Sequence, residues 1–66
     1  MQVTINGQIQ TLPDGITAAG LIEMMGLTGQ RLALEVNGEI VPASTHETRD
    51  VQSGDEVEIV HAVGGG

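Results

Sequence analysis

Three consecutive glycines, Gly64, Gly65 and Gly66, close the chain directly after a strand-like run over residues 56–63. Glycine has no Cβ, so such a segment can enter a channel that is too narrow for other residues. From residue 62 to the end, the segment can extend at most about 17 Å. We therefore expect the reactive group to be the α-carboxylate of Gly66, with Gly64 and Gly65 threading it into the active site of another protein.

A terminal carboxylate must be activated before it reacts with nucleophiles, because resonance and negative charge make its carbon a poor electrophile. Adenylation by ATP would give a mixed anhydride, from which a sulfur or nitrogen nucleophile can displace AMP. Ordering each tail residue costs roughly 1–2 kcal/mol, and glycine lies at the upper end. A folded surface must therefore supply the affinity for a partner, and Val60 and Val63 are the apolar contact candidates. The other interpretation is an inert tail or a linker.

His46 and His61 are the only histidines, and their spacing is not that of a metal site. Ser44, Glu47 and Asp50 lie near His46 in sequence, but a nucleophilic triad also needs a pocket and an oxyanion hole. A chain of 66 residues has little volume for such a pocket. We expect His46 in a solvated loop and His61 on a partly exposed strand. We therefore expect that the chain is not an enzyme and that it has no catalytic residue, no metal and no bound cofactor of its own.

Acidic residues dominate the charge, since nine of them face two arginines and no lysine, for a net charge of −7. Such a chain is poorly suited to nucleic acid or to anionic membranes, which attract basic proteins. It suits a protein partner with a basic surface, although acidity can also serve solubility alone. Asp55, Glu56 and Glu58 lack the twelve-residue spacing of a calcium loop, and we expect them on the solvated face of the last strand.

The chain is the size of one small domain, and it contains neither cysteine nor aromatic residues. The core must therefore be built from valine, isoleucine, leucine and methionine, without disulfides. The first residues show no basic stretch followed by an apolar one, so we expect no signal peptide. No run approaches the roughly 18 apolar residues of a membrane span. These features favour a cytoplasmic protein.

Five segments show the alternation or the flanking turns of strands. They are residues 2–5, 8–12, 32–36, 39–41 and 56–63. The Asn-Gly pairs at residues 6–7 and 37–38 are the strongest short hairpin signals and join the first two pairs of strands. Pro42 ends the fourth strand, and residues 43–52 are expected to be irregular with one short helical turn.

A single amphipathic helix is predicted between the second and third strands. Thr17 is a good N-cap, and Gly26 is a good left-handed C-cap. The buried stripe recurs at helical spacing: Ala18, Leu21, Ile22 and Met25. One helix packed on one face of a four- or five-stranded sheet buries these side chains, so the fold class is α+β. We predict a domain over residues 1–63 and a glycine tail over residues 64–66.

Two longer motifs make the whole chain resemble the ThiS family of sulfur carrier proteins in thiamine biosynthesis. They are VNGEIVP at residues 36–42 and GDEVEIVHAV at residues 54–63, followed by the closing Gly-Gly. The resemblance implies a ubiquitin-like β-grasp fold, a mixed sheet in which the first and last strands pair in parallel.

The resemblance also implies a sulfur carrier function. An E1-like adenylyltransferase of ThiF type uses ATP and magnesium to adenylate the terminal glycine, here Gly66. A persulfide donor then supplies the sulfur that turns Gly66 into a thiocarboxylate. A thiazole synthase of ThiG type takes that sulfur into the thiazole ring.

Three alternatives remain open from the sequence. The small subunit of molybdopterin synthase has the same fold, ending and activation. A ubiquitin-like modifier would instead join its terminal carboxylate to lysines of other proteins. An interaction domain with an inert tail would keep its function when Gly65 and Gly66 are deleted.

Overall fold

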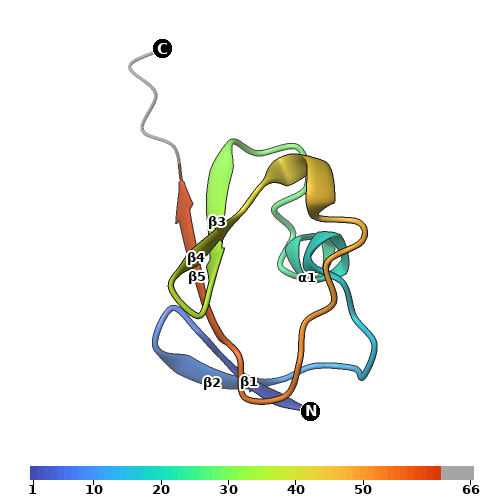
Figure 1. Ribbon diagram of the computed structural model, residues 1–66, viewed down its shortest axis with the longest axis vertical. Helices are drawn as coiled ribbons and strands as arrows, with labels where there is room; N and C mark the ends of the chain where they lie inside the picture. Colours follow the sequence, from blue (N-terminus) through green and yellow to red (C-terminus); the bar gives the residue numbers. More distant parts are fainter. Residues whose placement is uncertain (62–66) are drawn as a thin grey trace.

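The computed structural model describes residues 1–61, which form five strands, one α-helix and one short 3₁₀ helix (Figure 1). Their order along the chain is the predicted one. The elements are β1 (Gln2–Ile5), β2 (Gln8–Thr11), α1 (Ala18–Met24), β3 (Leu32–Val36), β4 (Glu39–Val41), η1 (Ala43–Thr45) and β5 (Glu56–His61). The predicted domain boundary after residue 63 lies outside the described residues.

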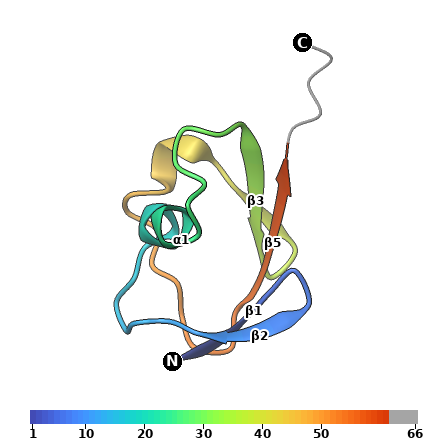
Figure 2. The ribbon, with the colours of Figure 1, turned by 180° about the vertical axis from the view of Figure 1, so that it is seen from behind.

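The strands form one mixed sheet in the order β2-β1-β5-β3-β4. The last strand therefore lies at the centre, parallel to β1 and antiparallel to β3. Thr4 is opposite Glu56 in the parallel pair, and Leu34 is opposite Ile59 in the antiparallel pair. Helix α1 lies on one side of this sheet (Figures 1 and 2). The α+β class and the predicted five strands are confirmed.

Both Asn-Gly pairs make tight hairpin turns. Asn6 and Gly7 have φ values of 49° and 82°, and Asn37 and Gly38 have φ values of 53° and 83°. Two successive residues with positive φ form the turn whose twist matches that of antiparallel strands. These turns set the registers of β1 with β2 and of β3 with β4.

The core consists of aliphatic side chains that the sheet and the helix bury between them. Its members are Val3, Ile5, Leu12, Ala18, Leu21, Ile22, Leu34, Val36, Val41, Val51, Val57 and Ile59. The three methionines contribute less than predicted, since Met1 and Met25 are only partly buried and Met24 is 57% exposed. The branched side chains on alternate strand positions therefore supply most of the burial.

Helix α1 begins at the predicted cap. The Thr17 hydroxyl accepts a hydrogen bond from the Gly20 backbone N–H at 3.1 Å. The Ala18 N–H donates to the Arg49 carbonyl at 2.9 Å, so the chain after η1 also satisfies the helix start. Since the first N–H groups of a helix have no partner within it, both contacts stabilise this terminus.

The end of α1 is the predicted left-handed cap. Gly26 has a φ of 72°, and its N–H donates to the Glu23 carbonyl at 3.0 Å. The Leu27 N–H donates to the Ile22 carbonyl at 3.0 Å, which completes the paired hydrogen bonds of a Schellman motif. No helix within residues 1–61 is long and apolar enough to cross a membrane.

Candidate functional site

Strand β5 is the central strand and the last described element before the predicted tail (Figure 1). Val60 lies near its end and is 54% exposed. Its predicted role as an apolar contact for a partner stays a prediction. Val63 and the three glycines Gly64, Gly65 and Gly66 lie outside the described residues. Their predicted roles therefore stay predictions.

The two hairpin asparagines hold the backbone of β5 in place. The side-chain oxygen of Asn6 accepts from the Ile59 N–H at 2.8 Å, and that of Asn37 accepts from the Glu56 N–H at 2.9 Å. Their own backbone N–H groups donate to the carbonyls of Val57 and Glu56. The sequence pattern predicts both asparagines only as turn formers. The structure shows that they also fix the strand that carries the candidate site.

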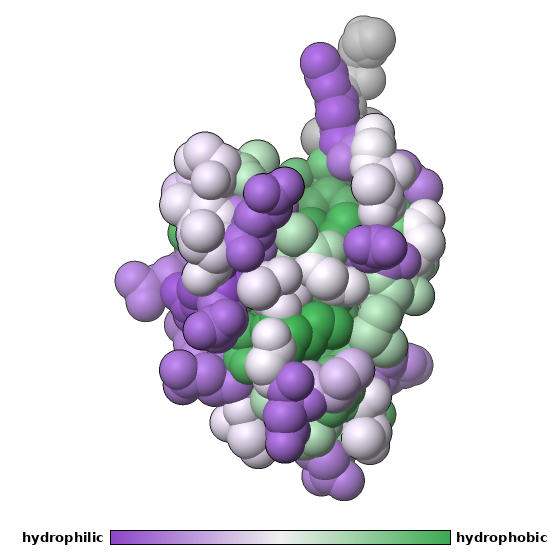
Figure 3. All heavy atoms as spheres, turned by 90° about the vertical axis from the view of Figure 1, so that its right-hand side faces the viewer, coloured by the Kyte–Doolittle hydropathy of each residue, from purple (hydrophilic) through white to green (hydrophobic). Residues whose placement is uncertain are grey.

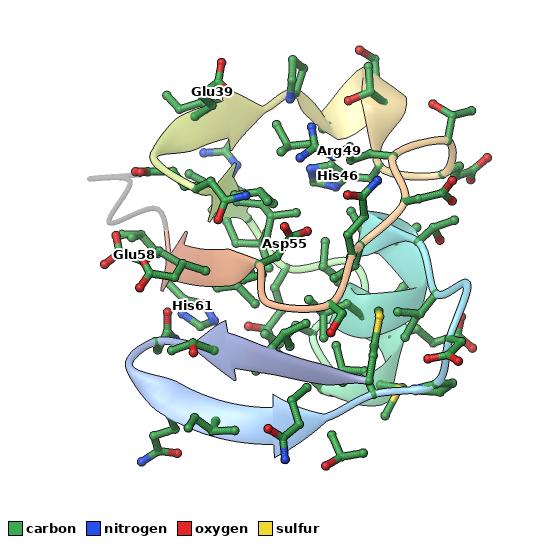
Figure 4. The ribbon with its side chains drawn as sticks, turned by 60° about the horizontal axis from the view of Figure 1, so that its bottom comes forward. Glu39, His46, Arg49, Asp55, Glu58 and His61 are labelled. Carbon is green, nitrogen blue, oxygen red and sulfur yellow. The ribbon has the colours of Figure 1, made fainter. Side chains whose placement is uncertain are left out.

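Asp55 directly precedes β5 and is buried, with only 8% of its surface exposed. One carboxylate oxygen accepts from the Asn37 side-chain amide at 3.0 Å, and the other accepts from the Gln52 N–H at 2.8 Å. The expectation that Asp55 lies on the solvated face was wrong for this reason. Figure 4 shows Asp55 at the start of β5, where these hydrogen bonds fix the turn into the strand.

The two histidines lie apart and have different surroundings (Figure 4). The Nε2 of His46 lies 3.0 Å from the Val41 carbonyl, which can only accept, so this nitrogen carries the proton. His46 lies at the end of η1 and is half-buried, whereas a solvated loop position was expected. His61 is exposed, and its Nε2 lies 3.0 Å from the Gln30 side-chain oxygen.

No catalytic or metal cluster forms around these histidines within residues 1–61. His46 makes no hydrogen bond there to Ser44, Glu47 or Asp50. No three histidine, cysteine or acidic side chains of the described residues are placed to hold a metal ion.

A shallow hollow of about 210 Å³ lies between α1, residues 27–32 and η1, on the side of the molecule that faces the viewer in Figure 3. Ile22, Leu27 and Leu32 supply apolar walls, and Gln30 and His46 supply polar atoms. Its volume is below the roughly 300 Å³ at which small-molecule sites begin. The hollow therefore gives no support for an enzyme active site.

The profile of the ThiS family matches residues 3–66, nearly the whole chain. The chain belongs to the ThiS family. The crystal structure of the thiamine biosynthesis protein ThiS from Geobacter metallireducens is similar, with a TM-score of 0.87, 26% identity and full coverage of both chains. The solution structure of a thiamine biosynthesis protein from the same organism has a TM-score of 0.81, also at 26% identity, covering all of this chain and 88% of that one. The β-grasp fold implied by the resemblance is confirmed.

Two proteins named thiazole synthase contain a segment similar to this ThiS family chain. The one from Paramagnetospirillum magneticum is 36% identical and the one from Magnetococcus marinus is 32% identical, each over all 66 residues of this chain. The chain spans only 20% of the length of each of them. The uncharacterized protein ycf40 of Porphyra purpurea is 26% identical, and the match covers 93% of its length.

Proposed function

We propose that this chain is a sulfur carrier in thiamine biosynthesis, with residues 1–63 as the carrier domain and residues 64–66 as the tail. Its membership of the ThiS family over residues 3–66 is the observation that carries the proposal. The chain serves as a co-substrate of partner enzymes and acts in the cytoplasm. It is the terminal carboxylate of Gly66 that reacts.

The proposed reaction sequence begins on a ThiF-type adenylyltransferase that uses ATP and magnesium. The Gly66 carboxylate attacks the α-phosphorus of ATP, releases pyrophosphate and becomes an acyl adenylate. The outer sulfur of a persulfide donor displaces AMP and gives an acyl disulfide. A second thiol then attacks the donor's inner sulfur, so that the two form a disulfide and the Gly66 thiocarboxylate is released. A sulfur nucleophile of this kind can attack an imine carbon on the substrate of a ThiG-type thiazole synthase.

The domain contributes position and affinity to this sequence. Strand β5 is held on both sides, by β1 and β3, and by the side chains of Asn6 and Asn37. A rigid strand fixes the point from which Gly64 and Gly65 thread toward a partner's active site. Val60 and Val63 are the proposed apolar contacts next to this point.

The link to thiazole synthase is supported by the two relatives of that name. Each contains, within one longer chain, a segment similar to all of this chain. Covalent linkage of a carrier to its acceptor enzyme would raise the local concentration of one at the other. The same relatives favour the thiamine pathway over the molybdopterin synthase alternative.

Intact-mass spectrometry tests the proposed function. After incubation with a ThiF-type adenylyltransferase, ATP, magnesium and a persulfide donor, we expect a mass increase equal to replacing one oxygen by sulfur. A control lacking Gly65 and Gly66 should keep its circular dichroism spectrum and show no increase. An unchanged mass for the full chain, or covalent adducts with lysines of other proteins in place of the thiocarboxylate, would contradict the proposal.

A further inference from the structure

The end of strand β5 extends beyond its neighbour β1 (Figures 1 and 2). The parallel pairing of β1 with β5 has Ile5 opposite Val57 as its last pair, and the Asn6 side chain then accepts from the Ile59 N–H. The antiparallel pairing with β3 continues as far as His61. Beyond Ile59, the described part of β5 therefore has a strand neighbour on one side only.

The backbone of His61 faces away from β3. The N–H and C=O groups of a strand residue point to the same edge of the strand, and the edge alternates from one residue to the next. Since the Ile59 N–H points to Asn6 on the β1 side, the polar backbone groups of Val60 point to β3 and those of His61 point back to the β1 side. Within residues 1–61, β3 therefore gives the backbone of His61 no direct hydrogen bond.

The side chain of His61 connects this end of the strand to the rest of the domain. The Nε2 of its imidazole lies 3.0 Å from the side-chain oxygen of Gln30. A carboxamide oxygen can only accept, so Nε2 carries a proton and donates it to this hydrogen bond. Both the neutral Nε2–H tautomer and the imidazolium can make the same contact.

The end of helix α1 places Gln30 for this contact. The Leu27 N–H donates to the Ile22 carbonyl at 3.0 Å, and the Gln30 N–H donates to the Leu27 carbonyl at 3.1 Å. The second bond closes a turn over residues 27–30, in which Gly29 has a φ of 83°. A positive φ at the third residue is typical of a type II turn and favours glycine there. A series of hydrogen bonds therefore runs from α1 to the end of β5.

We propose that Gln30 is a positioning residue for the reaction of Gly66. By holding His61, Gln30 fixes the point and the direction in which the chain leaves β5. The five residues after His61 reach at most about 17 Å, so the place where their first residue starts limits where the Gly66 carboxylate can arrive. This inference rests on the proposed function and adds a residue that acts through His61.

The expected benefit of the Gln30–His61 hydrogen bond is a smaller entropy loss when the chain binds an enzyme. A residue that is already ordered in the free chain loses little further conformational freedom on binding. Without the hydrogen bond, the end of β5 would have to be ordered on the enzyme. The affinity would then fall, whereas the reaction at Gly66 would proceed as before once the carboxylate has been bound.

A double-mutant cycle tests this role. Gln30→Ala, His61→Ala and the double variant are compared with the wild type in ATP–pyrophosphate exchange on a ThiF-type adenylyltransferase. Each single variant should raise KM for the carrier about threefold, as expected for one lost hydrogen bond at the surface, and leave kcat unchanged. The double variant should also show about a threefold increase, rather than the roughly ninefold increase of two independent effects.

The variant His61→Gln separates positioning from acid–base chemistry. A glutamine side chain keeps an N–H donor for Gln30 but does not titrate, so KM should stay within about twofold of the wild-type value and kcat should not change. A loss of kcat in His61→Gln would assign the imidazole to the chemistry itself and overturn the positioning role.

Gln10→Ala is the matched control, because Gln10 is an exposed glutamine on β2, on the far side of β1 from β5. Its KM should equal that of the wild type, and hydrogen exchange of the Val60 amide should be faster in Gln30→Ala than in Gln10→Ala. Equal KM values for Gln30→Ala and the wild type would overturn the positioning role alone. A wild-type chain that supports no pyrophosphate exchange would overturn the proposed function and, with it, this role of Gln30.

Discussion

Asp55 is a single buried carboxylate that joins three parts of the chain. It accepts hydrogen bonds from the Asn37 amide and the Gln52 N–H, and its carbonyl accepts from the Thr4 N–H at 2.9 Å. The side chain thus connects the hairpin of β3 and β4 to the turn before β5.

Replacing Asp55 by alanine should lower the free energy of unfolding by about 1–3 kcal/mol, because two donors lose their acceptor inside the protein. Asparagine should cost less, since its oxygen can still serve one of the two donors. Urea unfolding monitored by circular dichroism measures both. Asp50 is exposed and its carboxylate makes no hydrogen bond within residues 1–61, so Asp50→Ala is the control. Equal stability of Asp55→Ala and Asp50→Ala would contradict the role given to Asp55.

The two hairpin asparagines show where sequence-based prediction ends at this scale. The turns at Asn6 and Asn37 could be predicted, because an Asn-Gly pair between alternating strands acts locally. The hydrogen bond from the Ile59 N–H to the Asn6 side chain could not be predicted, since it joins residues 53 positions apart. It exists only because β5 inserts beside β1, and that pairing is a property of the whole sheet. The same holds for Asp55, whose donors come from two other segments.

At the scale of elements, α1 is the best-predicted part of the fold, and local chemistry explains why. Seven residues are too few for a helix that is stable on its own. The helix therefore needs both its caps and its apolar stripe to be stable, and both could be predicted from the sequence. By contrast, residues 46–51 gave no periodic pattern. Val51 is nevertheless 4% exposed, and its N–H donates to the Ile16 carbonyl at 2.9 Å.

The C-cap of α1 gives a prediction for Gly26. Its φ of 72° is open to glycine but costs other residues, while a Cβ added there would meet no atom within 4 Å. Gly26→Ala should therefore destabilise the domain by about 1–2 kcal/mol through the backbone alone. Gly26→Asn should cost less, because asparagine tolerates the left-handed conformation. Thermal unfolding of both variants checks the order, and the reverse order would contradict the cap.

At the scale of the whole molecule, the net charge of −7 opposes folding. The nine acidic residues outnumber the two arginines, so the acidic side chains repel one another on balance. This repulsion destabilises the compact chain. The radius of gyration is 11.3 Å, whereas the Debye length falls from about 30 Å at 0.01 M salt to about 8 Å at 0.15 M. Repulsion therefore spans the whole domain at low salt and only neighbouring groups at physiological salt.

Raising sodium chloride over this range should increase the melting temperature of the free chain, by up to about 4 °C. Differential scanning calorimetry at matched salt concentrations measures this effect. Glu35 and Glu58 are directly opposite each other in the register of β3 with β5. The Glu35→Gln/Glu58→Gln variant lacks both carboxylates, so its melting temperature should respond less to salt. A melting temperature of the wild-type chain that does not change with salt would contradict a destabilising role of the net charge.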